Sequence, residues 1–334
     1  MGWFLPFLET PQDYLETPTT NSPITLDTGE VDDKLTICLL QPRLRENQDD
    51  PLQATDQVVA LMQAAACQCQ CQEQYIDLFV LPELCPIGYS EDTFAHYLPS
   101  NQTAQAMYRE IDEKLQQAAV TLHSYICYGT IGWEPKPHVQ NEKYGSSKGQ
   151  LQYFIRQVVV DPTGHQIASY EKIHLCDYGD CAETRFFTPG ETIVSFQIAG
   201  WKFGILICAD MRYPNLCQKL TRHRDHRVDV ILQPACFARD MSFATWRAFG
   251  TTRAVENGVY FVACNYAGDG FGASSIIPPW VDDTTAHLPQ VMNNTAGYMI
   301  HTLERAVLNH ARTTLPFYKH ATQSCSMCPC GGND

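Results

Sequence analysis

Three side chains with reactive groups, a thiol, a carboxylate and an amine, each stand just past an extended segment of the sequence. Cys208 follows an apolar run at residues 203–207, Glu83 follows another at residues 78–82, and Lys172 ends a strand-like segment. Open α/β sheets bind their ligands at the carboxyl ends of strands, so these residues are candidates for one site. Each also has a structural interpretation, because a free cysteine often fills a core, Glu83 could belong to a loop, and most lysines lie on surfaces.

The combination of residue types suits nucleophilic catalysis by a thiol. A thiol becomes an effective nucleophile when it loses its proton, which a nearby carboxylate can accept, while a nearby ammonium group favours the thiolate. Glu83 ends an apolar run, where an unpaired carboxylate is costly and needs a partner or a function. His174 offers the better-known Cys–His pairing, but a structural role is the preferred interpretation of that residue.

The segments that carry these residues predict alternating strands and helices. Strands are expected at residues 35–42, 77–83, 124–132, 151–164, 191–200, 201–210, 228–236 and 259–268, and helices at 51–74, 103–124 and 241–256. This alternation is typical of an α/β layer architecture. Within 151–164, the sequence Asp-Pro-Thr-Gly predicts a turn.

Three regions follow from composition. Residues 1–33 are rich in Thr, Pro, Asp and Glu and predict an N-terminal extension that is poorly ordered. Residues 34–318 contain neither a linker nor a repeat and predict one domain, and residues 319–334 predict a Cys-rich tail.

Charge and hydropathy exclude several classes of protein. The net charge of -14 argues against a nucleic-acid partner, since phosphate binding needs clustered Lys and Arg. No apolar run reaches the roughly 18 residues of a membrane span, and the N-terminus lacks the basic region of a secretory signal. We therefore expect a soluble protein.

The 15 cysteines cannot all pair within one chain, because their number is odd. Free thiols in a reducing compartment are the simpler interpretation, which predicts a cytoplasmic location. Two clusters, Cys67, Cys69 and Cys71 and then Cys325, Cys328 and Cys330, could suggest zinc, but neither alone supplies the four ligands of a structural site. No metal is expected.

Three blocks of the sequence resemble the signatures of the nitrilase superfamily of carbon-nitrogen hydrolases, in its amidase-like branch. They are LPELCPIGY at residues 81–89, YEKIHL at 170–175 with Glu183 and FFTPG after it, and GILICADMRYP at 204–214. They occur in that family's order, and similar segments at 253–268 and 271–279 extend the resemblance over about residues 34–280.

The resemblance implies roles for individual residues. Cys208 would be the nucleophile, Glu83 the general base, and Lys172 the cation that stabilises the tetrahedral intermediate together with the backbone N–H of Ala209. Glu183 would position the substrate and the lysine. Candidates for the pocket wall and for substrate binding are Tyr89, Tyr178, Cys181, Arg212, Phe237 and Trp246. The implied fold is a four-layer αββα sandwich, in a homodimer or larger homo-oligomer, without a cofactor.

The predicted activity is hydrolysis of a small linear amide or N-carbamoyl amine through a cysteine thioester, releasing ammonia or an amine and a carboxylic acid. Nitrile hydrolysis is less favoured, since nitrile hydrolysers usually carry Cys-Trp-Glu where this chain has Cys208-Ala209-Asp210. Asn215 and Arg156-Gln157 also depart from the usual pattern and leave the substrate open. A catalytically silent scaffold is a second alternative. A thiol-rich metal or redox module is a third, which bound zinc lost on deletion of residues 319–334 would support.

Overall fold

Two six-stranded sheets form the centre of the computed structural model, which describes residues 32–44, 50–136, 151–179, 181–222, 227–282, 287–315 and 317. The first sheet has the order β12 (Gly297–Glu304), β1 (Lys34–Gln41), β2 (Leu78–Val80), β3 (Tyr125–Pro135), β4 (Leu151–Val160), β5 (Gln166–Glu171). The second has the order β11 (Gln290–Val291), β10 (Ser275–Ile277), β9 (Tyr260–Cys264), β8 (Val230–Pro234), β7 (Trp201–Ile205), β6 (Ser195–Ile198). The predicted extension falls mostly on residues 1–31, which lie outside the described residues, as does the tail at 319–334.

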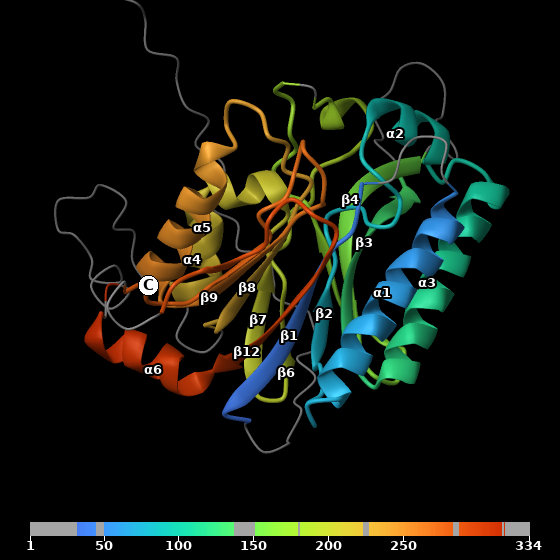
Figure 1. Cartoon of the computed structure of the whole chain (residues 1–334). Coiled ribbons are helices and arrows are strands. Elements are labelled where there is room, and N and C mark those ends of the chain that lie inside the picture. The colour runs from blue at the N-terminus through green and yellow to red at the C-terminus, as the bar shows by residue number, and fades with distance from the viewer. Residues whose placement is uncertain are drawn as a thin grey trace, which may run out of the picture.

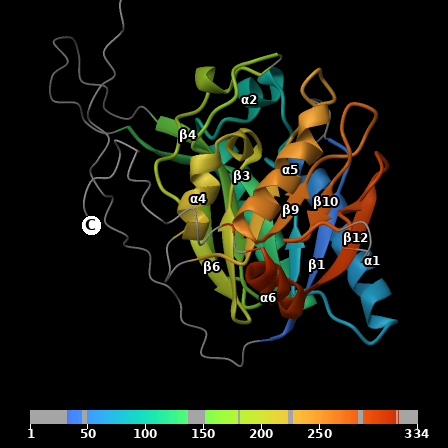
Figure 2. The ribbon, with the colours of Figure 1, turned by 90° about the vertical axis from the view of Figure 1, so that its left-hand side faces the viewer.

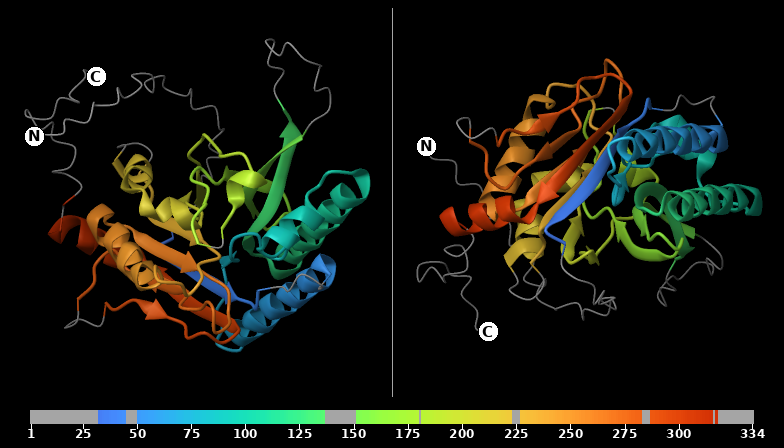
Figure 3. Two further views of the ribbon diagram at one scale, coloured as in Figure 1. Left: turned by 90° about the horizontal axis from the view of Figure 1, so that it is seen from above. Right: turned by 60° about the horizontal axis from the view of Figure 1, so that its bottom comes forward.

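Helices cover the outer face of each sheet (Figure 1). α1 (Pro51–Gln70) and α3 (Gln102–Leu122) pack together over the first sheet, and α4 (Pro214–Arg222) and α5 (Ala244–Asn257) lie over the second. α2 (Glu91–Tyr97), α6 (Arg305–Thr314) and the 3-10 turns η1 (Glu183–Arg185) and η2 (Cys208–Arg212) complete the described helical elements. The layers are helix, sheet, sheet, helix, which confirms the predicted αββα sandwich (Figures 2 and 3).

Local sequence signals explain where the main helices begin and end. The carboxylate of Asp50 accepts the backbone N–H of Leu52 at 3.0 Å, and Pro51 occupies the first position of α1, where its missing N–H costs nothing. The Asn101 side chain caps α3 in the same way. α5 ends at Gly258, which has a φ of 58° that glycine adopts without strain.

The core lies between the two sheets. Strands β1, β2, β8 and β9 are buried almost throughout, as expected when both faces of a sheet are covered. At this interface the Cys264 thiol of β9 donates to the carbonyls of Leu40 in β1, at 3.2 Å, and Val80 just beside it in β2, at 3.3 Å. Cys264 therefore fills space in the core, and its thiol has backbone carbonyls as hydrogen-bond acceptors.

Most of the predicted strands and helices are present, generally with shorter bounds, although β3 extends three residues beyond its predicted end. The segment at 151–164 is β4 followed by the predicted turn, where the Gly164 N–H donates to the Asp161 carbonyl at 2.9 Å. Sequence patterns did not identify β12, which pairs antiparallel with β1 along its whole length. Within the described ranges, no helix combines the length and apolar character that crossing a bilayer requires.

Gly129 in β3 gives room to the backbone that follows Glu83. A Cβ at position 129 would lie 2.2 Å from the backbone nitrogen of Leu84. We expect Gly129→Ala to lower the free energy of unfolding by about 1–3 kcal/mol, the usual cost of overpacking a core. Gly297→Ala is the matched strand control, because the added Cβ meets no atom within 4 Å. Urea denaturation measures the free energy of unfolding of both variants. Equal values for the two would show that the backbone after Glu83 can move aside without cost.

Candidate active site

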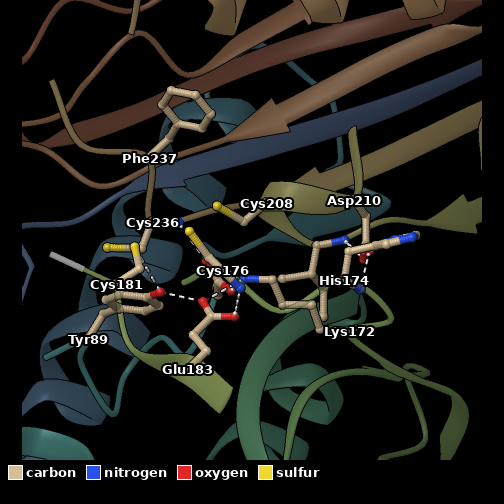
Figure 4. Close-up of polar contacts among 12 residues, drawn as sticks. Tyr89, Lys172, His174, Cys176, Cys181, Glu183, Cys208, Asp210, Cys236 and Phe237 are labelled. Carbon is tan, nitrogen blue, oxygen red and sulfur yellow. Dashed lines mark hydrogen bonds and ion pairs between the residues drawn. The ribbon is translucent and has the colours of Figure 1, made fainter. Parts of the chain in front are cut away.

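The predicted residues meet at the carboxyl ends of strands from both sheets. Glu83 lies three residues beyond β2, and Lys172 directly follows β5. Because β2 and β5 run in the same direction, their ends lie at the same edge of the first sheet. Cys208 begins η2, beyond the end of β7 in the second sheet. The site is therefore built across the interface between the sheets (Figure 4).

Lys172 lies between two buried carboxylates. Its Nζ is 2.7 Å from Glu83 Oε1 and 2.7 Å from Glu183 Oε1, and all three side chains have no exposed surface. Two carboxylates and one ammonium leave a net negative charge on the cluster. Removing one partner from such a group leaves buried charge uncompensated, which is why the three residues must be placed together.

The remaining carboxylate oxygens are held by backbone amides. Glu83 Oε2 accepts the N–H of Cys236 at 2.9 Å, and Glu183 Oε2 accepts the N–H of Cys176 at 2.8 Å. The Tyr89 hydroxyl also donates to Glu183 Oε1. These contacts fix the orientation of both carboxylates relative to the lysine, and Figure 4 shows Glu183 beside Lys172.

The environment changes the proton affinity of each reactive group. Burial raises the pKa of Glu83, although the Lys172 ammonium opposes that shift. Burial by itself lowers the pKa of Lys172, but the carboxylates of Glu183 and Glu83 outweigh it and hold that pKa well above its ordinary value. Burial, and then the charge of Glu83, raise the pKa of the Cys208 thiol. Both effects favour the uncharged thiol at position 208.

Cys208 has a left-handed backbone conformation, with a φ of 44°. Such angles are uncommon for residues other than glycine and persist where surrounding contacts enforce them. Here the Gln233 amide donates to the Cys208 carbonyl at 3.0 Å, and Arg253 Nε donates to the Met211 carbonyl at 3.0 Å. The turn that presents the thiol is therefore held from two neighbouring elements.

Asp210 joins the lysine segment to the cysteine segment. Its buried carboxylate accepts the backbone N–H of His174 at 2.8 Å, the backbone N–H of Ile207 at 3.1 Å and the hydroxyl of Tyr170 at 2.8 Å. His174 Nδ1 lies 3.0 Å from the same carboxylate, and its ring stacks on Tyr213 with centroids 3.5 Å apart. These contacts give His174 a structural role.

A cavity of about 320 Å³ opens beside Cys208. It is lined by Tyr89, Ser90, Glu91, Phe94, Cys176, Tyr178, Gly179, Cys181, Ala182, Cys208, Cys236, Phe237, Ala238, Asp240, Ser242 and Phe271. Most of the lining is aromatic, thiol or small. This volume suits a small molecule, since ligand pockets usually start near 300 Å³.

Of the residues predicted to form the pocket wall, four line the cavity and Trp246 lies behind them. Tyr89, Tyr178, Cys181 and Phe237 line the cavity. The Trp246 ring packs behind Phe237, with centroids 4.9 Å apart, and its Nε1 donates to the Ala273 carbonyl at 2.9 Å.

Arg212 lies next to the cavity wall. Its guanidinium carbon is 5.1 Å from the ring centroid of Phe237 and 5.3 Å from that of Tyr178. One nitrogen donates to the Ser242 hydroxyl at 3.1 Å. The cation is therefore packed among aromatic rings that face the cavity.

Sequence reasoning did not select Cys236 or the amide of Cys176. Cys236 stands just beyond the end of β8, so the same rule of strand ends that selected Cys208 could have found it. The sequence raises the cysteine cluster of residues 67–71 as a possible zinc site. Cys69 is buried, whereas Cys67 and Cys71 are exposed, so the three thiols do not share one environment. Over the described residues, no group of three or more His, Cys, Asp or Glu side chains is placed to hold a metal ion.

The family model for carbon-nitrogen hydrolases matches residues 38–313, most of the chain. The chain belongs to the carbon-nitrogen hydrolase family. The match continues past Pro279, where the resemblance in the sequence faded, and includes β12 and most of α6.

Curated relatives of this carbon-nitrogen hydrolase are similar at low identity. A hydrolase of Schizosaccharomyces pombe is 24% identical over 72% of this chain and 70% of its own length. The omega-amidase of Homo sapiens is 26% identical over 60% and 68%, respectively. The deaminated glutathione amidase of Mus musculus is 26% identical over 49% and 52%, so the chain spans about half of that relative.

Solved structures share the fold. An amidase from Nesterenkonia sp. has a TM-score of 0.62 at 21% identity, covering 84% of this chain and 95% of its own. A protein from Xanthomonas campestris, described as a CN-hydrolase superfamily member with an arsenic adduct in its active site, has a TM-score of 0.66 at 22% identity, covering 87% and 98%. These values support the αββα sandwich.

Lys172→Met tests the electrostatics of the buried cluster. The change leaves Glu83 and Glu183 without their cation, so we expect the free energy of unfolding to fall by about 3–5 kcal/mol near pH 8. A carboxylate whose folded-state pKa is raised contributes stability below its unfolded pKa and loses it as pH rises through the folded pKa. The deficit should therefore be smaller near pH 5.5.

Lys114→Met is the matched control, because Lys114 pairs with Asp56 on the surface. Its loss should stay below about 1 kcal/mol at both pH values. Urea denaturation at the two pH values provides the measurement. An equal deficit for Lys172→Met at both would contradict the assignment of the buried charges.

Proposed function

We propose that the chain hydrolyses a small linear amide or N-carbamoyl amine through a thioester on Cys208. The observation that carries this proposal is the buried Glu83–Lys172–Glu183 cluster together with the Cys208 thiol at the wall of a small cavity. The family membership supports hydrolysis of a carbon–nitrogen bond.

The first half of the reaction forms the thioester. Glu83 accepts the Cys208 proton as the sulfur attacks the carbonyl carbon of the amide. Negative charge then develops on the carbonyl oxygen, and Lys172 with the backbone N–H of Ala209 stabilises it. Glu83 returns the proton to the departing nitrogen, the carbon–nitrogen bond breaks, and ammonia or an amine leaves.

The second half releases the acid. Glu83 takes a proton from water, whose oxygen attacks the thioester carbon, and the carbon–sulfur bond breaks. The proton returns to the Cys208 sulfur. A raised pKa of Glu83 suits this double role, because a base whose pKa lies closer to neutral pH can both accept and return a proton. Glu183 would keep Lys172 in place without exchanging protons.

The cavity wall and the relatives support the substrate class. Tyr89, Tyr178 and Phe237 offer apolar surface to a short chain, and Arg212 would act by supporting the Tyr178 and Phe237 rings, which it packs against. Trp246 would act by supporting Phe237. A glutamate-to-leucine variant of the Nesterenkonia amidase carries the acetamide moiety of fluoroacetamide on its active-site cysteine, and a cysteine-to-alanine variant has been solved in complex with butyramide.

Two alternative functions and two further expectations belong to this proposal. Nitrile hydrolysis would use the same thiol and cluster, and a silent scaffold would keep the fold without turnover. Pairing of subunits is implied by the family resemblance, and sedimentation equilibrium tests it. A cytoplasmic location agrees with twelve free cysteines in the described part of the chain, and fractionation of cells tests it.

Cys208→Ala should abolish turnover while leaving the fold intact, because it removes the nucleophile and only a small volume. Cys217→Ala is the matched control, since Cys217 is also buried, in α4, and does not line the cavity. We expect ammonia release to fall at least about 1000-fold in the first variant and to persist in the second. Retained activity in Cys208→Ala would sink the thioester mechanism.

A panel of small amides, N-carbamoyl amines and nitriles ranks the substrate classes. We expect amides to release ammonia fastest, and a brief incubation followed by mass spectrometry should find the acyl group on the peptide that contains Cys208. Glu83→Gln should lower the rate at least about 100-fold, because the amide cannot accept the thiol proton. Fast nitrile turnover would favour the alternative activity, and silence across the panel would favour the scaffold.

A further inference from the structure

The charged side chains that line the cavity are both acidic. Glu91 and Asp240 belong to its wall together with Cys208, whereas no Lys, Arg or His of the described residues lines it. Much of the remaining wall consists of aromatic rings, those of Tyr89, Phe94, Tyr178, Phe237 and Phe271. Carboxylates and the faces of aromatic rings both attract cations. The wall therefore favours a bound group with a positive charge over one with a negative charge.

The arginines that contact residues of this wall are engaged by the protein itself. Arg185 forms an ion pair with Glu91 and so offsets that carboxylate. Arg239 Nε donates to a backbone carbonyl at 2.5 Å. The Arg212 guanidinium packs against aromatic rings and donates to the Ser242 hydroxyl at 3.1 Å. These cations leave the charge of Asp240 as the one that a group in the cavity meets.

Asp240 differs from Glu91 in how its carboxylate is bonded. Its Oδ1 accepts the backbone N–H of Ser242 at 2.7 Å and the hydroxyl of Ser242 at 2.6 Å. Within the part of the chain that the structure describes, no hydrogen bond reaches Oδ2. The bonds from Ser242 also lower the pKa of Asp240, which keeps the carboxylate ionised at neutral pH. The side chain is thus held by one oxygen and presents the other.

The second oxygen of Asp240 faces the loop at residues 176–182. A Cβ added to Gly179 would lie 3.9 Å from Asp240 Oδ2, an ordinary contact distance. Glycine has no such atom, so space remains between this loop and the carboxylate. Gly179 and Asp240 both line the cavity that contains the Cys208 thiol. The carboxylate is therefore accessible to a group held between these two segments.

We propose that the cavity selects amides whose far end carries an ammonium group, and that Asp240 recognises this group. The ammonium donates to Oδ2 of Asp240, and the aliphatic chain that joins it to the amide packs against the aromatic wall. A carboxylate in the same place would meet a like charge. The reacting amide rests on the proposed function, whereas the selection of charge on binding does not.

The turn before α5 gives Asp240 a structural role as well. The Asp240 carbonyl accepts the N–H of Phe243 at 3.1 Å, and its side chain holds Ser242 in the same turn. Asparagine has an oxygen in the place of Oδ1 and carries no charge. Asp240→Asn therefore separates the two roles, because it keeps the acceptor for Ser242 and removes the negative charge.

Binding is measured by titration calorimetry in a Cys208→Ala chain, which cannot form a thioester. The probes are amides of similar length: δ-aminovaleramide ends in an ammonium, hexanamide in a methyl group and glutaramic acid in a carboxylate. We expect δ-aminovaleramide to bind about threefold to fivefold more tightly than hexanamide, since water screens an ion pair at an exposed carboxylate. Glutaramic acid should bind most weakly. The preference should shrink as salt rises from about 0.02 M to about 0.5 M.

Asp240→Asn in the same background should remove the preference, so that δ-aminovaleramide and hexanamide bind equally. Asp56→Asn is the matched control, because it also removes one negative charge but lies in an exposed pair with Lys114 on α1 and α3. The Asp56→Asn chain should keep the full preference for the ammonium.

Three results would overturn the proposal. They are tighter binding of glutaramic acid, absence of binding by δ-aminovaleramide, and a preference for the ammonium that survives Asp240→Asn. Ammonia release from the same amides by the unchanged chain tests the proposed function separately. If the expected order of binding is found while no amide is hydrolysed, the selection of charge stands and the thioester mechanism fails.

Discussion

The buried contact of Lys172 with Glu83 and Glu183 is the constraint on which the rest of the site depends. A lysine and two carboxylates without solvent exposure are tolerable only when each charge has its partners within hydrogen-bond distance. Backbone amides at Cys176 and Cys236 complete the carboxylates, so the surrounding loops must adopt one arrangement. The mutual pairing of these charges thereby holds two carboxylates and one ammonium group in fixed positions.

The two sheets supply different parts of this cluster. Glu83 and Lys172 come from the first sheet, while Cys208 and the Cys236 amide come from the second. The packing of the two sheets therefore sets the distance from the Glu83 carboxylate to the Cys208 thiol. Asp210 reinforces this arrangement, because its carboxylate accepts the backbone N–H of His174, which follows β5 of the first sheet, and that of Ile207, which follows β7 of the second. The contacts that pack the two sheets together thus also fix the geometry of the site.

The cavity has a wall that is mostly aromatic, thiol or small, and Cys208 forms part of it. The loop that carries Cys176 and Cys181 belongs to the same wall. Its contacts reach Glu183 through the Cys176 amide, and Tyr89 joins the Cys181 sulfur to the same carboxylate. One small loop therefore borders both the cavity and the charged cluster.

The sequence by itself determined the order of the longer strands and helices up to β9, the positions of Glu83, Lys172 and Cys208 at strand ends, and the family, because these depend on local periodicity and short motifs. It did not reveal β12, whose pairing with β1 joins residues about 260 positions apart. Nor did it show that Cys236 supplies an amide to Glu83 or that Trp246 packs against Phe237. Those contacts were decided by the tertiary structure, since they depend on how two sheets pack and how loops turn, which no local pattern encodes.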